Sequence, residues 1–393
     1  PSLNARRSAA SFFQTSTLAA DFYSYMPACE RKVHLCYSTQ AAAACDNLPS
    51  NIGRQSLIDS LIAAFGLHEK CQLVDVVRAS RKDVEAFHDQ KYVAEVFRDR
   101  PEDPDDLSEK KDIKQREKFG LAYDCPPFPQ LSLYAGHVVG SSICAANVLL
   151  NADDGSQNVV VNWYGGRHHA LKHSASGYCY VNDIVLAILR LRIKYRRIFY
   201  LDLDLHHGDG VEEAFKFLNF VTTCSVHRHD VGFFPGTGAK SERGAYNVPT
   251  RRGLSDENFA KIIKKVLILM ENVQPDVIVL QCGSDGLAND PCGEWNLTIR
   301  GLASGIMEIV DKFECTPFLI LGGGGYNHTE TAKFCAWLTK NLVGDTTAWE
   351  DIPEHTHLDE YEQDGFRFWT PNNTKCKPGR RDENGDFSEL KLS

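Results

Sequence analysis

Five short apolar runs constrain the fold of this chain more than any other feature. Each is too short for a core helix and is rich in Val, Ile, Leu, Phe or Tyr: NVVVNWY (158–164), RIFYLDLDL (197–205), FVTTCSV (220–226), DVIVLQCG (276–283) and PFLILGGGG (317–325). Near-continuous apolarity is typical of strands that are covered on both faces. Helical patterns lie at 183–193 and 257–273, with another at 55–67. Strands that alternate with helices predict an α/β domain with a parallel sheet.

Polar clusters follow four of the five predicted strands. The first strand is followed by Gly165, Gly166, Arg167, His168 and His169, and the second ends in or is followed by Asp202, Asp204, His206, His207 and Asp209. The fourth strand is followed by Ser284 and Asp285, and the fifth by the run GGGGY, which ends at Tyr326. In an open parallel sheet, ligands bind beyond the carboxyl ends of the strands. Because isolated charges are costly to bury, this arrangement indicates a functional site.

Asp204 and His206 lie two residues apart, so they share one face of an extended segment. For these two residues alone, a strand end with hydrogen-bonded carboxylates is an equally good interpretation. Asp285 favours a metal ion because it offers a third ligand from another strand end. Two carboxylates and one imidazole leave a coordination position open, as catalytic metal sites do, and the set suits both Zn²⁺ and Fe²⁺.

His168 and His169 are candidate acid–base groups, since Gly165 and Gly166 allow the chain to turn there. A histidine pair is more often structural, but Asp202 and Asp209 are left over after metal binding and could each orient one imidazole. Tyr326 at the end of the glycine run fits oxyanion stabilisation by a phenol. Tyr178, Phe233 and Phe234 pack either in the core or as walls of an alkyl-chain tunnel.

Composition narrows the classes of function. The 393 residues carry a net charge of −9, which argues against binding to a nucleic-acid backbone and suits a Lys-rich peptide partner. Thirteen scattered cysteines without CxxC pairs indicate a reducing compartment. No membrane partner is expected. Residues 101–116 are interpreted as a solvated loop, and the first twenty residues, with two arginines and no acid, as an irregular extension or a transit peptide.

Five motifs in this order resemble the class I zinc-dependent histone deacetylases, with the histone deacetylase 8 branch most similar: GGRHHALKHSASGYCYVND (165–183), YLDLDLHHGDGVEEAF (200–215), VGFFPGTG (231–238), QCGSDGLANDP (281–291) and LGGGGYN (321–327). The similarity runs from about residue 33 to 375. It implies the arginase/deacetylase fold, a single domain with a mostly parallel sheet of about eight strands flanked by helices. We expect an N-terminal extension (1–30), a catalytic domain (31–380) and a C-terminal tail (381–393).

The resemblance also implies a role for individual residues. The zinc ligands would be Asp204, His206 and Asp285; the paired histidines would be His168, backed by Asp202, and His169, backed by Asp209; and Tyr326 would polarise the carbonyl group. The substrate would be bound by Asp124 at the rim, by Gly177, Tyr178 and Phe234 in the tunnel, and by Cys292. A monovalent cation, K⁺, would lie beside Asp202, Asp204, His206, Ser225 and Val226.

Four features depart from the family pattern. Arg167 replaces a bulky apolar residue before the histidine pair and predicts a more polar pocket floor. Tyr178 replaces Phe in the tunnel wall, and Cys292 replaces Leu or Met at the rim. The segment 239–249 is shorter than in the family, which puts rim contacts built by that loop in doubt.

The resemblance implies hydrolysis of Nε-acetyl-lysine in histones or other proteins, with possible corepressor partners, in the nucleus or cytoplasm; the start of the chain leaves an organelle open. Alternatives are a long-chain acyl-lysine or acetylpolyamine deacylase of the same fold, and a non-catalytic acyl-lysine-binding scaffold. A two-metal ureohydrolase is disfavoured because its DxHxD run is missing: the next Asp lies at 209.

Overall fold

An eight-stranded sheet forms the centre of this computed structural model, which describes residues 29–100, 113–153 and 155–392. Its order is β2-β1-β3-β8-β7-β4-β5-β6, and all neighbouring strands run parallel. The strands are β1 (Arg31–Cys36), β2 (Gln72–Val74), β3 (Gln157–Asn162), β4 (Ile198–Asp202), β5 (Val221–Arg228), β6 (Ala245–Thr250), β7 (Val277–Gln281) and β8 (Phe318–Leu321). This sheet confirms the predicted fold class.

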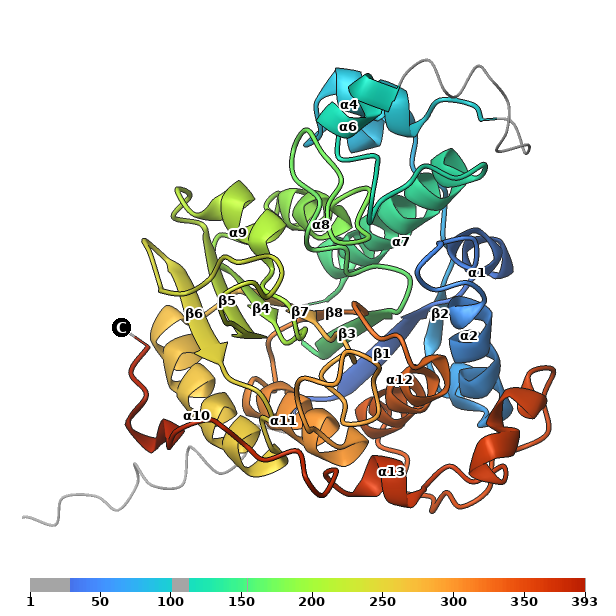
Figure 1. The fold of residues 1–393 in the computed structure, drawn as a ribbon, viewed down its shortest axis with the longest axis vertical. Coiled ribbons are helices and arrows are strands. Elements are labelled where there is room, and N and C mark those ends of the chain that lie inside the picture. Colours follow the sequence, from blue (N-terminus) through green and yellow to red (C-terminus); the bar gives the residue numbers. More distant parts are fainter. Residues whose placement is uncertain (1–28, 101–112, 154, 393) are drawn as a thin grey trace, which may run out of the picture.

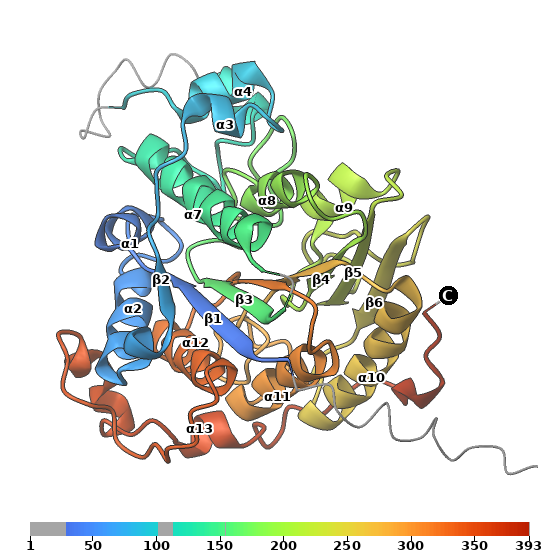
Figure 2. The ribbon, with the colours of Figure 1, turned by 180° about the vertical axis from the view of Figure 1, so that it is seen from behind.

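Helices cover both faces of the sheet (Figures 1 and 2). One face carries α7 (Leu131–Asn151) and α8 (Asp183–Leu191), with α9 (Asp209–Phe215) beyond them; the other carries α2 (Arg54–Ala64), α10 (Asp256–Val273), α11 (Ile299–Lys312) and α12 (His328–Leu342). Shorter helices are α1 (Thr39–Cys45), α3 (Arg81–Val84), α4 (Gln90–Val96), α6 (Ile113–Lys118) and α13 (Pro371–Thr374), with 3₁₀ turns at Leu67–Lys70, Leu358–Asp364 and Phe387–Glu389.

Alternate side chains of the strands enter two separate cores. On β3, Val159 and Val161 pack into the core under α10, α11 and α12, whereas Val160 packs into the core under α7 and α8. Because successive strand residues point to opposite faces, a strand buried on both sides must be apolar throughout. This explains why the central strands were predictable from their apolar runs.

The five predicted strands correspond to β3, β4, β5, β7 and β8, and the predicted helices to α2, α8 and α10. The segment 239–249, which the sequence analysis treated as a loop, contains most of β6 at the edge of the sheet. Most of the expected extension at 1–30 and most of the expected loop at 101–116 lie outside the described residues.

Strand order brings the polar clusters together. The neighbours β3, β8, β7 and β4 end at Asn162, Leu321, Gln281 and Asp202. Since these strands are parallel, the segments that follow them all leave from one edge of the sheet. Clusters that lie more than 150 residues apart in the sequence therefore meet at the carboxyl edge.

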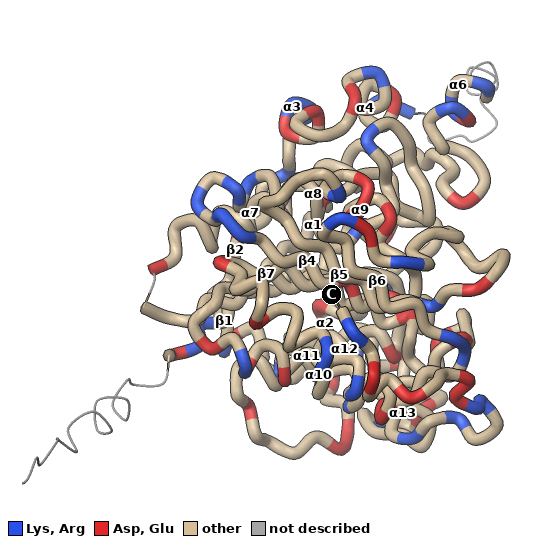
Figure 3. The backbone as a smooth tube through the Cα atoms, turned by 90° about the vertical axis from the view of Figure 1, so that its left-hand side faces the viewer, with Lys and Arg blue, Asp and Glu red and all other residues tan. Residues whose placement is uncertain are grey.

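Helix α7 is long and apolar enough to cross a membrane, but 67% of its most apolar window is buried in the protein, as in a core helix of a globular domain. The C-terminal segment contacts α10, where the Asp382 carboxylate accepts a hydrogen bond from the Ser255 hydroxyl at 2.7 Å. Acidic and basic residues are interspersed along the outer helices and loops (Figure 3).

Candidate metal and acid–base site

Three metal-binding side chains converge beyond the ends of β4 and β7. The Nδ1 atom of His206 lies 2.9 Å from Oδ2 of Asp285 and 3.3 Å from Oδ1 of Asp204. Both carboxylates are buried and the imidazole is half-buried. The structure thus brings together the three residues that the sequence singled out as a possible ligand set.

The two carboxylates are fixed by donors from neighbouring strands. Asp204 Oδ2 accepts hydrogen bonds from Gln281 Nε2 and from the backbone N–H of Gly324, both at 2.8 Å. A Cβ atom at Gly324 would lie 2.4 Å from Asp285 Oδ2, so the glycine run lets the backbone reach the site. Sequence reasoning missed Gln281, although it sits in the QCGSDG motif at the end of β7.

The charges and donor atoms of this cluster suit a cation. Burial and the nearby Asp204 carboxylate raise the pKa of Asp285 to about 7. Burial alone would lower the pKa of His206, but Asp204 and Asp285 raise it to about 10. Two buried carboxylates that share one positive group form the oxygen- and nitrogen-donor set that divalent metals bind. The donor set fits Zn²⁺, and Fe²⁺ fits it equally.

Two histidine–aspartate pairs lie beside these donors. Nδ1 of His168 is 2.8 Å from Asp202 Oδ2, and Nδ1 of His169 is 2.7 Å from Asp209 Oδ1. The two imidazole centroids are 3.9 Å apart. The hydrogen bond at Nδ1 leaves Nε2 of His169 free to act on another group, whereas Nε2 of His168 lies 3.8 Å from Asp204 Oδ1. The hydroxyl of Tyr200, which the sequence analysis did not single out, donates to Asp202 at 2.5 Å.

The pKa values of the two histidines are shifted in opposite directions. Burial opposes protonation of His168, but Asp202 and Asp204 outweigh it and raise its pKa to about 9. Burial and the adjacent His168 lower the pKa of His169 to about 4. Near neutral pH these shifts favour a positively charged imidazolium at His168 and a neutral imidazole, with a free lone pair, at His169.

A pocket of about 260 Å³ opens onto this cluster and is lined by Asp124, His169, Gly177, Tyr178, His206, Phe234 and Tyr326. Phe234 packs edge-on against His169, with centroids 4.9 Å apart. A Cβ atom at Gly177 would lie 2.4 Å from Cδ2 of His169, so a larger residue does not fit there. The exposed Asp124 accepts a hydrogen bond from the Gly177 N–H at 2.7 Å.

Tyr326 lines the same pocket. Its ring is 5.8 Å from that of Tyr178, and its backbone N–H donates to Asp290 Oδ2 at 2.7 Å. Burial, with Asp285 and Asp204, raises the pKa of Tyr326 well above its usual range, so the phenol keeps its proton. Asp290 therefore positions Tyr326, and the sequence analysis missed it; the ANDP part of its motif was the available signal.

The remaining predicted residues are Ser225 and Val226, proposed for the monovalent cation, and Cys292, proposed for the substrate. Asp202 and Ser225 are paired across β4 and β5, with Val226 following, and the Ser225 hydroxyl lies 2.9 Å from Nδ1 of His227. Cys292 lies deeper than a rim position implies, because its sulfur, a nitrogen of His206 and a carboxylate oxygen of Asp285 lie within 4.8 Å of one another.

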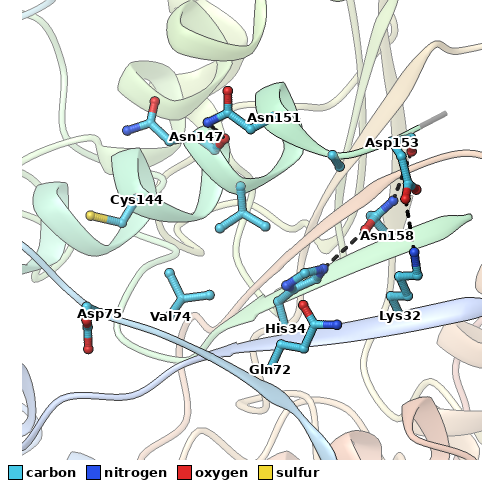
Figure 4. A pocket seen from close by; sticks show the side chains of 12 residues that line it. Lys32, His34, Gln72, Val74, Asp75, Cys144, Asn147, Asn151, Asp153 and Asn158 are labelled. Carbon is cyan, nitrogen blue, oxygen red and sulfur yellow. Dashed lines mark hydrogen bonds and ion pairs between the residues drawn. The ribbon is translucent and has the colours of Figure 1, made fainter.

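A larger hollow, of about 570 Å³, lies elsewhere, between β1, β2 and the end of α7 (Figure 4). Its polar side chains bind one another: Lys32 Nζ lies 3.0 Å from Asp153 Oδ2, and His34 Nε2 lies 3.1 Å from Asn158 Oδ1. It lacks the converging carboxylates and imidazoles of the smaller pocket, which remains the candidate site.

Comparison with known proteins gives one consistent family. The family described as "Histone deacetylase domain" matches residues 48–342. Histone deacetylase 8 of Xenopus tropicalis is 39% identical over 357 residues, which are 88% of this chain and 92% of the relative. Histone deacetylase 8 of Danio rerio is 39% identical, over 90% of this chain and 91% of the relative. Human histone deacetylase 1 is 38% identical, over 83% of this chain and 67% of the relative.

Proposed function

The chain belongs to the histone deacetylase family and is a lysine deacetylase, a hydrolase; on that premise we propose that it cleaves Nε-acetyl-lysine at the pocket between Tyr326 and His169. The convergence of His206, Asp204 and Asp285 beside two carboxylate-backed histidines carries this proposal. A structural histidine pair has no need of an open metal-donor set within the same pocket.

Asp204, His206 and Asp285 would hold the metal ion, which is typically zinc in this family. When bound, zinc lowers the pKa of a water molecule and polarises a carbonyl oxygen. The remaining work falls to this chain's own side chains. Gln281 and Gly324 hold Asp204 in place, so the ligand geometry is set before substrate arrives.

His169 is the proposed general base. Its Nδ1 proton is directed at Asp209, so Nε2 faces the pocket with a free lone pair and can take a proton from water. His168, held by Asp202, carries the positive charge of the pair. A protonated imidazole of the pair then donates to the leaving lysine amine.

Tyr326 is the proposed oxyanion donor, since its phenol remains protonated at the pocket wall. The aromatic rings of Tyr178 and Phe234 and the bare backbone of Gly177 would enclose the alkyl chain of the lysine. Asp124 at the mouth would accept hydrogen bonds from the substrate backbone. Cys292 would contact the acyl end of the substrate rather than its backbone, because it lies beside His206 and Asp285.

A K⁺ site is proposed at Asp202, Asp204, His206, Ser225 and Val226. The pairing of Asp202 with Ser225 supports it, because the two residues lie side by side on β4 and β5. We propose residues 31–380 as the catalytic domain. Acetylated histone tails are the proposed substrates, corepressor proteins are possible partners, and the nucleus, the cytoplasm or both are the proposed locations.

The proposal is tested by turnover of a fluorogenic acetyl-lysine peptide by the zinc-loaded protein. Tyr326→Phe should lower the rate about 10²–10³-fold, the usual effect of losing one oxyanion donor. Tyr123→Phe, at a tyrosine that is 90% exposed, is the control and should keep the parent rate. Equal rates for the parent and Tyr326→Phe would contradict the proposed role of the phenol.

A further inference from the structure

Cys292 brings a sulfur atom to the candidate metal site. This sulfur, a ring nitrogen of His206 and a carboxylate oxygen of Asp285 all lie within 4.8 Å of one another. The nitrogen and the oxygen belong to two of the three residues that the proposed function assigns to the metal ion. Zinc binds the sulfur of cysteine as readily as it binds imidazole and carboxylate groups. The cluster therefore contains one more potential ligand than the three already assigned.

The separation of the three donor atoms suits binding to one ion. Zinc bonds of about 2.0–2.3 Å place two neighbouring ligands of a tetrahedral site about 3.5 Å apart. The limit of 4.8 Å that holds for Cys292, His206 and Asp285 exceeds this spacing by only about 1.3 Å. A change of rotamer moves the sulfur of a cysteine by about 3 Å, so the side chain can close this gap while the backbone stays in place.

A tight turn fixes the backbone that carries this sulfur. Residues 290–293 form a turn in which the Gly293 N–H donates to the Asp290 carbonyl at 3.1 Å. The residue types are those of a type I β-turn, with Asp first, Pro291 second and Gly last. The Asp290 carboxylate also accepts a hydrogen bond from the Cys292 N–H at 2.9 Å. The turn thus holds Cys292 in place and leaves its side chain as the part that can move.

The same carboxylate joins this turn to the proposed oxyanion donor. Asp290 is only 4% exposed, and its Oδ1 accepts the Cys292 N–H. Its Oδ2 accepts the N–H groups of Tyr326 and Asn327 at 2.7 and 3.2 Å. One buried carboxylate therefore holds both the sulfur-bearing residue and Tyr326. Cys292 is attached to the reaction centre rather than to the outer surface.

Packing alone does not account for a cysteine at this position. Cys292 is half-buried and packs against the core under α10, α11 and α12, where a thiol behaves as a small hydrophobic group. The family pattern has Leu or Met at this rim position, and both fill such a space without a thiol. The chain thus departs from the pattern at the position where a cysteine adds a soft donor beside His206 and Asp285.

We infer that Cys292 is a fourth protein ligand of the metal ion in the resting protein. Its sulfur occupies the coordination position that Asp204, His206 and Asp285 leave open. The S–H bond breaks as the bond from sulfur to the metal forms, and the proton passes to the solvent. When a substrate takes this position, the sulfur takes up a proton again and lies beside the acyl group. The inference deepens the proposed function and rests on its metal centre.

A sulfur ligand has two consequences for the site. The first concerns the choice of metal: two carboxylates and an imidazole suit Zn²⁺ and Fe²⁺ equally, whereas a thiolate favours zinc. The second concerns the substrate, because molecules in which sulfur fills the open position do not bind it. If sulfur fills that position in about nine tenths of the molecules, KM is about tenfold higher than it is without the sulfur.

Absorption of the cobalt-substituted protein tests the ligand without using activity. Cobalt(II) replaces zinc in tetrahedral sites, and a bound thiolate then adds a charge-transfer band in the near ultraviolet. The parent should show this band, and Cys292→Ala should lack it. Cys282→Ala is the matched control, because Cys282 is a buried cysteine of the same stretch, QCGSDGLANDPC (281–292), and packs in the core. The control should keep the band.

Two further measurements on these variants give the size of the effect. The ratio of zinc affinity to Fe²⁺ affinity, measured by competition with a chelator, should fall in Cys292→Ala and stay at the parent value in Cys282→Ala. The KM for an acetyl-lysine peptide should fall about tenfold in Cys292→Ala, with kcat close to that of the parent. The fall in KM gives the fraction of the resting protein in which sulfur is bound.

The inference is overturned if the cobalt-loaded parent shows no thiolate band, or if Cys292→Ala keeps it. If Cys292→Ala does not fold, alkylation of the parent by iodoacetamide decides. Zinc should slow the alkylation of Cys292 and leave that of the exposed Cys315 unchanged, and equal rates for Cys292 with and without zinc overturn the inference.

Failure of the proposed function gives a different result. The thiolate band would then be present in the parent and absent from Cys292→Ala, yet no acetyl-lysine peptide would be cleaved. Turnover by a parent that shows no thiolate band has the opposite meaning, because it keeps the proposed function and removes Cys292 from the ligand set.

Discussion

Replacing Gln281 by leucine should weaken zinc binding without removing a ligand. Gln281 is fully buried, and its amide supplies one of the two described donors to Asp204 Oδ2, at 2.8 Å; the other is the Gly324 N–H. A hydrogen bond to a charged group contributes about 1.5–3 kcal/mol, which converts to roughly ten- to a hundredfold in affinity. The measured range for partners of metal ligands is the same.

The assay is zinc affinity by competition with a chromophoric chelator, at fixed pH, for Gln281→Leu and for Gln55→Leu. Gln55 is a matched control, because its buried amide donates to Asp59 Oδ1 at 3.0 Å, a carboxylate outside the site. Gln55→Leu should lower stability and leave zinc affinity at the parent value. Unchanged zinc affinity in Gln281→Leu, or an equal loss in both variants, would refute the reasoning.

Three further perturbations have directions set by the structure. Asp202→Asn removes a carboxylate that helps to raise the pKa of His168 to about 9, so the fall of kcat/KM at alkaline pH should begin at a lower pH. An unchanged pH profile would exclude His168 as the group that causes this fall. Gly177→Ala places a Cβ 2.4 Å from the His169 ring, and kcat should fall about a hundredfold with the fold retained by circular dichroism; a parent-like kcat would show that the pocket wall can give way. Lys333 is fully buried and pairs with Asp364, so Lys333→Met leaves that carboxylate without its partner. The free energy of unfolding measured with urea should fall by about 3–5 kcal/mol, and a fall of less than about 1 kcal/mol would mean that water replaces the lysine.

The predictable part of the fold is the part that is buried on both faces. Strands β3, β4, β7 and β8 are fully buried and have continuous apolar sequences. The missed strands lie toward the edges of the sheet. β1 mixes Arg31, Lys32 and His34 with apolar residues, β2 has only three residues, and β6 contains Pro249, which is confined to edge strands because it lacks an N–H donor.

The meeting of candidate site residues was predictable where one motif held two neighbouring members of the cluster. Asp204 and His206 share a strand end, and His168 and His169 are adjacent, so their residue types and spacing sufficed to nominate them. Gln281 and Asp290 were missed because each acts on a residue more than thirty positions away in the sequence, through a contact that exists only after the strands are paired. A neutral amide at the end of a strand gives no signal of its own.

Arg167 illustrates the opposite case. The sequence marked it as a polar departure in the pocket floor, but spacing could not tell whether a carboxylate faced it. Only the structure shows that Asp183 is occupied by backbone donors and Ser142, leaving the guanidinium unpaired. Whether a buried charge has a partner depends on packing, which no local pattern encodes.

The central claim is that Asp204, His206 and Asp285 form a metal centre that drives acetyl-lysine hydrolysis. The most direct measurement is zinc content and acetate release on the same samples of the parent and Asp285→Ala. We expect one zinc per chain and steady turnover in the parent, and loss of both together in Asp285→Ala, which stays folded. A parent that binds one zinc yet releases no acetate, or an Asp285→Ala protein that keeps the parent's zinc and rate, would contradict it.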